Sequence, residues 1–173
     1  MSNDAPVHIV PYDSEWPNRF EAERRVLVEA IGPWLPTGVI EHIGSTAVPG
    51  LDAKPVIDMM AGVESLDGSR AALDVLERHQ YCYAPYRTEV MHWFCKPSPA
   101  HRTHHLHLIP VGSPLWIARL AFRDYLRAHV EVAAEYAALK RRLADEHRFD
   151  REAYTDAKAP FVQRVLEIAL RSR

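Results

Sequence analysis

The chain has 173 residues, of which 47% are hydrophobic and 25% are charged, and these values predict one globular domain over residues 1–173 and exclude wholesale disorder. A formal net charge of −2 excludes the strongly basic surface of a general nucleic-acid binder, so no nucleic-acid partner is expected. No run approaches the roughly 18 apolar residues of a membrane span. The segment Met1–Pro11 lacks the pattern of a signal peptide, so the sequence predicts a cytoplasmic protein without a membrane partner.

The first sixty residues alternate between extended and helical patterns. Residues 7–10 read as a short extended entry, and residues 16–31 carry apolar side chains at helical spacing, which predicts an amphipathic helix. Residues 39–43 and 55–60 are strand candidates. The second of them is mostly apolar, so we expect it to lie in the centre of a sheet.

A helix is expected next over residues 66–79, followed by aromatic-rich strands over 81–84 and 90–96 and a further strand within 102–111. The two cysteines lie in the aromatic strands and are expected to remain thiols, because no export signal accompanies them. Three helices complete the chain, at residues 114–129, 132–147 and 150–171. Pro160 is expected to interrupt the last one. This order favours a mixed sheet with packed helices and a helical C-terminal half.

The segment between the first two strand candidates carries the groups that phosphoryl transfer needs. Gly44 lets the backbone approach a phosphate closely, Ser45 offers a hydroxyl and Lys54 supplies a cation. Asp58 can bind Mg²⁺ through its oxygens. The candidate phosphate- or substrate-binding residues of this segment are His42, Gly44, Ser45, Thr46 and Lys54. On residue types alone, turn glycines, a solvated lysine and a turn-capping aspartate explain the segment equally well.

Four of the ten histidines fall within residues 101–107. Because side chains alternate along a strand, His105 and His107 are expected to share one face, with His104 on the other. Two imidazoles about 7 Å apart can bind a transition metal or exchange protons near neutral pH. The alternative is a surface strand whose histidines have no joint role.

The C-terminal helices carry further candidates for phosphate binding. These are Arg123 and Tyr125 on one helix, and the (i, i+4) pairs Tyr136–Lys140 and Tyr154–Lys158 on the next two. If these faces turn towards the sheet, they form a cationic, hydroxyl-bearing wall. The alternative for each residue is an ordinary solvated helix face.

Several of these stretches resemble the GrpB family, a group related to the nucleotidyltransferase superfamily. The matching stretches are Val10–Pro17, Glu41–Leu51, Lys54–Asp58, Thr103–Leu108 and Phe122–Leu126. The resemblance implies an α/β (α+β), nucleotidyltransferase-like fold. It also implies a possible link to coenzyme A synthesis, since some relatives are fused to an enzyme of that pathway.

The resemblance also exposes a departure from active nucleotidyltransferases, which carry two carboxylates in an Asp-x-Asp or Asp-x-Glu pattern. Asp58 matches the first position, but Met60 stands at the second, and His105 and His107 stand where a third carboxylate is expected. This departure argues against a mechanism with two Mg²⁺ ions and favours one ion such as Zn²⁺ or Mn²⁺.

The leading hypothesis is a metal-assisted nucleotidyl- or phosphoryl-transferase-like protein that acts on a phosphate-bearing, nucleotide-like small molecule. Asp58 and His107 would hold the divalent ion (Mg²⁺, Mn²⁺ or Zn²⁺), with His105 as a further ligand or general base, so Asp58 and His105 are the catalytic candidates. One alternative, motivated by Met60, is a non-catalytic nucleotide-binding or adaptor module. The other is a histidine-based metal-binding protein with no nucleotide.

Overall fold

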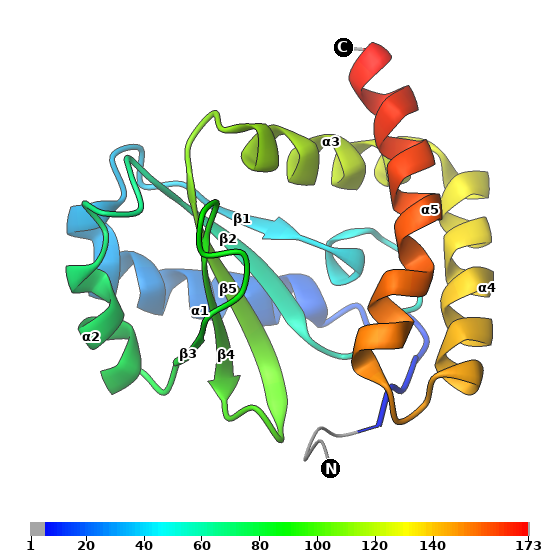
Figure 1. Cartoon of the computed structure of the whole chain (residues 1–173), viewed down its shortest axis with the longest axis horizontal. Coiled ribbons are helices and arrows are strands. Elements are labelled where there is room, and N and C mark those ends of the chain that lie inside the picture. The colour runs from blue at the N-terminus through cyan, green and yellow to red at the C-terminus, as the bar shows by residue number, and fades with distance from the viewer. Residues whose placement is uncertain (1–5, 173) are drawn as a thin grey trace.

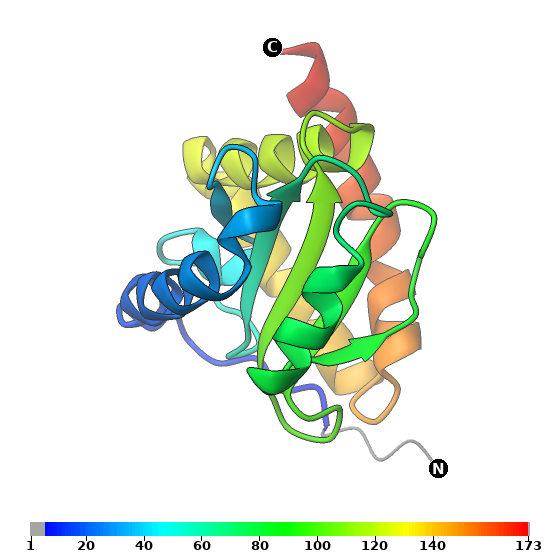
Figure 2. The same ribbon diagram turned by 90° about the vertical axis from the view of Figure 1, so that its left-hand side faces the viewer.

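The β-strands form one mixed sheet in the computed structural model, which describes residues 6–172. The strands are β1 (Ile40–Ile43), β2 (Ile57–Val63), β3 (Cys82–Ala84), β4 (His92–Pro97) and β5 (Arg102–Pro110). Their order across the sheet is β1-β2-β5-β4-β3, with β2 and β5 parallel and the other pairs antiparallel (Figures 1 and 2). The two strands that carry Asp58 and the histidines are therefore direct neighbours. Residues 1–5, part of the segment in which no signal peptide is expected, and Arg173 lie outside the described residues.

Helices cover the sheet from two directions. They are α1 (Trp16–Ile31), α2 (Ala71–Arg78), α3 (Pro114–Ala128), α4 (Val130–Glu146) and α5 (Arg151–Arg171). Helices α1 and α2 share one hydrophobic core with β2 and β5, in which Leu27, Met59 and Leu106 are fully buried. Burying a side chain of this size stabilises the fold by about 1.5–3 kcal/mol. On the opposite face Trp116 of α3 packs on Met60, while α3, α4 and α5 pack on one another (Figure 1).

The helix over residues 16–31 has the predicted bounds, but the expectations for two other helices were wrong in detail. The predicted helix over 66–79 begins only at Ala71, because Ser65 and Ser69 bond to the backbone of the preceding turn and so compete with helical pairing. The extended entry predicted over residues 7–10 agrees with the isolated antiparallel bridge between Val10 and Ala53.

Helix α5 continues through Pro160, against the expectation of an interruption. Proline removes one backbone bond, to the carbonyl of Asp156, and both residues are exposed, so water can solvate that carbonyl. Cys82 and Cys95 are thiols, as predicted. No helix within residues 6–172 combines the length and the apolar character needed to cross a membrane.

The register of β2 and β5 places the candidate residues on one face. Asp58 lies beside His105, and Met60 lies beside His107. Their neighbours Met59 and Leu106 point into the core under α1 and α2. The face that carries Asp58 therefore looks towards α3, α4 and α5, and the prediction that His105 and His107 share a face is confirmed by the contact that each makes with Asp58.

Candidate functional site: a cationic cavity around Asp58

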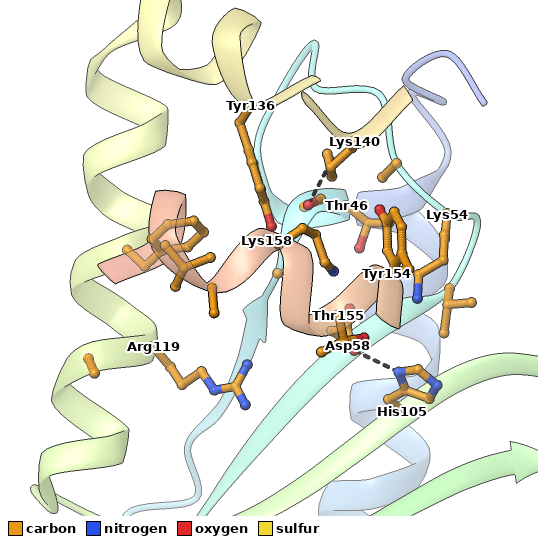
Figure 3. A pocket seen from close by; sticks show the side chains of 18 of the residues that line it. Thr46, Lys54, Asp58, His105, Arg119, Tyr136, Lys140, Tyr154, Thr155 and Lys158 are labelled. Carbon is orange, nitrogen blue, oxygen red and sulfur yellow. Dashed lines mark hydrogen bonds and ion pairs between the residues drawn. The ribbon is translucent and has the colours of Figure 1, made fainter. Parts of the chain in front are cut away.

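A cavity of about 470 Å³ is lined by the sheet on one side and by the C-terminal helices on the other (Figure 3). The polar side chains that line it from the sheet and its loops are Ser45, Thr46, Lys54, Asp58, Arg87 and His105, and Gly44 lies beside them. The polar lining from the helices is Arg119, Tyr136, Lys140, Tyr154, Thr155 and Lys158. Segments that are far apart in the sequence therefore contribute to one site.

Asp58 is positioned by a glycine and held by two histidines. Gly44 has a φ of +71°, and a Cβ at this position would lie 2.8 Å from Asp58 Oδ2, so the chain passes over the carboxylate only because the residue is glycine. Asp58 Oδ1 lies 2.9 Å from His105 Nδ1 and 3.8 Å from His107 Nε2. The side chain of Asp58 stays 30% exposed, so it remains open to the cavity.

These contacts fix the protonation of the carboxylate. Desolvation opposes its ionisation, but the hydrogen bond with His105 and the interaction with His107 outweigh it and hold the pKa of Asp58 well below its usual range. An ionised carboxylate can only accept, so His105 Nδ1 donates the hydrogen bond. Burial lowers the pKa of His107 to about 4, despite the opposing effect of Asp58, so His107 is neutral at pH 7.

Three lysines surround the other end of the cavity. Lys140 donates to Ser45 Oγ at 2.8 Å and to the Asp52 carbonyl at 2.5 Å. The Nζ atoms of Lys158 and Lys54 lie 4.2 and 5.2 Å from the centroid of the Tyr154 ring. Burial and the neighbouring lysines lower the pKa of Lys140 and of Lys158 to about 7.

Two tyrosines, Tyr136 and Tyr154, and two arginines, Arg87 and Arg119, complete the polar lining. Burial raises the pKa of Tyr136 and of Tyr154, so both side chains stay neutral hydroxyls. Burial lowers the pKa of Arg119, and the charge of Asp58 opposes this effect. Among residues 6–172, Asp58 is the only carboxylate in the lining, so the cavity holds an excess of positive charge suited to an anionic ligand.

Four of the predicted site residues lie outside the lining. His107 is buried and contacts the cavity through Asp58, whose Oδ1 lies 3.8 Å from His107 Nε2. His42 forms a hydrogen bond with Thr46 Oγ1 at 2.9 Å and stacks on Phe20, so it supports the Gly44–Thr46 loop. Burial lowers the pKa of His42 to about 4. Arg123 donates to Glu41 at 2.6 Å and to the His42 carbonyl at 3.1 Å, which ties α3 to β1. Tyr125 stacks on His129.

The family model described as GrpB protein matches residues 6–167. The chain belongs to the GrpB family. It is 38% identical over 174 residues to a UPF0157 protein of Pseudomonas aeruginosa, a match that covers 98% of this chain and 70% of the relative. The crystal structure of the conserved protein GrpB from Enterococcus faecalis matches with a TM-score of 0.86 at 32% identity, over 95% of this chain and 98% of that one.

More distant matches confirm the predicted nucleotidyltransferase-like fold of this GrpB chain. The structure of a non-canonical poly(A) polymerase complex matches with a TM-score of 0.53 at 14% identity, over 74% of this chain and 44% of that one, and this likeness concerns the fold alone. A dephospho-CoA kinase of Mycolicibacterium paratuberculosis is 30% identical over 182 residues, which cover 91% of this chain. The GrpB chain spans 44% of that kinase's length.

The lining of the GrpB cavity does not fit a pair of Mg²⁺ ions. Two-metal sites need several carboxylates, and Asp58 is the single one present. Met60, at the position of the second carboxylate, is buried in an apolar cluster with Ile43 and Met91. Over residues 6–172, no group of three or more His, Cys, Asp or Glu side chains is arranged to hold a metal ion.

Sequence reasoning missed Arg119, Arg87 and Thr155 in the GrpB cavity. A signal for Arg119 exists, because the spacing from Leu115 and to Phe122 places it on the apolar face of the 114–128 helix. No such signal marks Arg87, which reaches the cavity from an irregular loop with a φ of 49°.

Proposed function

We propose that this protein binds a phosphate-bearing, nucleotide-like ligand in the cavity, with the phosphates against the lysines and the reacting group beside Asp58. The observation that carries the proposal is the convergence of Lys54, Lys140 and Lys158 on a cavity whose lining contains one carboxylate. The three ammonium groups repel one another, and a polyphosphate relieves that repulsion because each of its oxygens can accept from an ammonium. The nucleotidyltransferase-like fold supports a nucleotide as the carrier of these phosphates.

Asp58 and His105 form the proposed reacting end. The carboxylate accepts from His105 through one oxygen and is open to the cavity, so it has capacity to accept from a hydroxyl of the ligand. The Asp58 carboxylate can then take the proton of that hydroxyl, while His105 keeps its Nδ1 proton and orients the carboxylate. A link to coenzyme A synthesis belongs to the same proposal, supported by the name of the dephospho-CoA kinase relative.

The sequence also predicts one divalent ion at Asp58, His105 and His107. In the structure the two imidazole nitrogens face the same carboxylate oxygen, so these donors are engaged with one another rather than set around a common point. The proposed chemistry therefore does not pass through a metal. Adding Mg²⁺, Mn²⁺ or Zn²⁺ to the binding assay tests the metal-assisted form directly.

A thermal-shift screen of nucleotides and coenzyme A precursors, each with and without metal, tests the proposal. A ligand at a hundred times its dissociation constant stabilises the native state by about 2.7 kcal/mol, so a true ligand is readily detected. Lys54→Met and Lys158→Met should each abolish most of the shift. Arg142→Met is the matched control, because Arg142 lies on α4 close to Lys140 but is exposed and paired with Glu146. Equal shifts in all four proteins would disprove binding in this cavity.

A second candidate is a non-catalytic binding module, and the burial of Met60 in the apolar cluster favours it. This function predicts nucleotide stabilisation without product and without metal dependence. Asp58→Asn separates the two candidates, because a module keeps its ligand shift in this variant and never shows turnover. Turnover in the wild type that Asp58→Asn removes would exclude the module. Stabilisation by metal alone, lost in His105→Ala with His107→Ala, would instead support a metal-binding protein.

A further inference from the structure

The chain uses lysine sparingly and concentrates it in one place. Its 21 basic residues are 17 arginines and four lysines. Three of these lysines, Lys54, Lys140 and Lys158, line the cavity, and the fourth, Lys96, pairs with Glu23 at 2.7 Å. Arginine stays charged in proteins, whereas lysine can lose its proton and become a nucleophile. The cavity therefore contains the residue type that can react as an amine.

Lys140 and Lys158 differ in the contacts that their side-chain nitrogen atoms make. Lys140 is 2% exposed and donates to Ser45 Oγ and to the Asp52 carbonyl, which hold its ammonium in place. Within residues 6–172, Lys158 has neither a hydrogen bond nor an ion pair, and its Nζ instead lies over the Tyr154 ring (Figure 3). The side chain of Lys158 is half-buried and lines the cavity, so its nitrogen is both accessible and without an acceptor.

The surroundings of Lys158 favour its neutral form. Burial is the main cause, and the charges of Lys54 and Arg119 add to it, while Asp58 opposes them, so that the pKa of Lys158 lies at about 7. Desolvation next to another cation is a recognised way to activate a lysine. Lys96 is the opposite case, because its nitrogen is engaged in an ion pair with the carboxylate of Glu23.

We propose that Lys158 is an acylation site for donors that carry an acyl group on a phosphate, namely acyl phosphates and acyl adenylates. The inference rests on the proposed function, because the phosphate of the donor must bind in the cavity. Lys54 and Lys140 hold that phosphate, which places the adjoining acyl carbon next to Lys158 Nζ.

The reaction is a simple acyl transfer. The neutral Lys158 amine attacks the acyl carbon, an N–C bond forms, and the bond from that carbon to the phosphate oxygen breaks. The phosphate, or the nucleoside monophosphate, leaves with the electron pair, and the amine proton passes to water. The product is an amide at Lys158, which has lost its positive charge and with it part of the attraction for phosphate. Acylation by this route lowers the affinity of the cavity for its own ligand.

The four lysines of the chain allow the test to be made on the wild-type protein. The full chain is incubated with acetyl phosphate or acetyl adenylate at pH 7.5, and the rate at each lysine is measured by peptide mass spectrometry. We expect Lys158 to react at least about tenfold faster than Lys96, and Lys140 to remain slow. Inorganic tripolyphosphate should protect Lys158 and leave Lys96 unchanged. If only one donor labels Lys158 selectively, that donor is the relevant class.

Two controls make the result decisive. An N-hydroxysuccinimide acetyl ester, which carries no phosphate, should show a much smaller preference for Lys158, and an equal preference would overturn the proposal. Lys158→Arg keeps the charge and should leave the rate at Lys96 unchanged. Equal rates at Lys158 and Lys96 with both phosphate donors would also overturn it, even if nucleotides stabilise the protein. Selective acylation without any nucleotide shift would support the acylation site and contradict the nucleotide ligand.

Discussion

Lys140 is nearly inaccessible to water, and among the described residues its nitrogen bonds only to a hydroxyl and a carbonyl. Burial lowers its pKa from 10.5 to about 7, so between these values the unfolded chain holds a proton that the folded chain lacks. The unfolded state therefore binds more protons, and the free energy of unfolding must rise with pH across this window. Below pH 7 both states are protonated and the full cost of burying the charge remains.

We predict that the free energy of unfolding of the wild type rises by about 2 kcal/mol between pH 7 and pH 9, relative to Lys140→Met. Urea denaturation of both proteins at both pH values measures this difference. The hydrogen bonds that the variant lacks are missing at both pH values, so their contribution cancels. Arg142→Met serves as the control and should follow the wild type at both values. Parallel pH profiles for Lys140→Met and the wild type would show that Lys140 keeps its proton in the folded state.

His42 lowers the free energy of unfolding at acidic pH. Burial lowers its pKa from 6.5 to about 4, so the folded chain keeps this ring neutral where the unfolded chain takes up a proton. Stability must therefore fall as the pH drops from 6.5 towards 4. We predict that the wild type loses about 2 kcal/mol more than His42→Gln between pH 7 and pH 5, measured by urea denaturation. An equal loss in both proteins would mean that His42 is protonated in the fold.

At the scale of elements, the turn that follows β1 depends on the close approach of Gly44 to Asp58 on β2. Gly44→Ala meets two obstacles, a positive φ and a contact of 2.8 Å with Asp58 Oδ2. Gly50→Ala meets only the first, because nothing lies within 4 Å of a Cβ at that position, where φ is +77°.

We predict that Gly44→Ala displaces the Asp58 carboxylate and abolishes ligand binding, whereas Gly50→Ala costs only about 1 kcal/mol of stability through its backbone conformation. Thermal shift with and without ligand measures both effects. If the two variants lose ligand binding equally, backbone strain and not the clash with Asp58 is responsible.

The elements themselves could be predicted because their signals are local. The apolar spacing from Trp16 to Ile31 sets one helix face without reference to the rest of the chain, and that helix has the predicted bounds. The prediction that His105 and His107 share one face was correct, because side chains two residues apart on a strand always point to the same side of the sheet. The interruption predicted at Pro160 was wrong, because the exposure of Pro160 is a tertiary property that the sequence does not show.

The lining of the cavity was harder to predict, because the rotation of a helix against the sheet is set by packing. Arg123 and Arg119 lie one turn apart on α3 and are chemically equivalent in the sequence. Arg123 bonds to Glu41 on β1, while Arg119 lines the cavity. The packing of α3 on the sheet, in which Trp116 and Met60 share one apolar cluster, turns Arg119 towards the cavity, and the only sequence signal for this is the place of Arg119 on the apolar face of the helix.

At the scale of the whole molecule, a positively charged cavity lies between the sheet and the helical half, beside the apolar packing of Trp116 on Met60. The chain as a whole carries a charge of −2, so the positive charge of the cavity is a local concentration. A ligand that contacts Lys54 after β1 and Lys158 on α5 bridges the two halves. Binding should therefore depend on the charge state of lysines supplied by both halves, not on the net charge.

The affinity for a phosphate ligand should consequently fall as the pH rises above 7. Lys140 and Lys158 have pKa values of about 7, so each loses its proton and its attraction for phosphate over the range from pH 7 to pH 9. The second ionisation of a phosphate, near pH 6, is complete before this range, so the ligand does not change. We expect at least about a tenfold loss of affinity over these two pH units, measured by isothermal titration calorimetry. Lys158→Arg, which cannot lose its charge, should show a smaller loss. A wild-type affinity that is constant from pH 7 to pH 9 would mean that neither lysine contacts the phosphate.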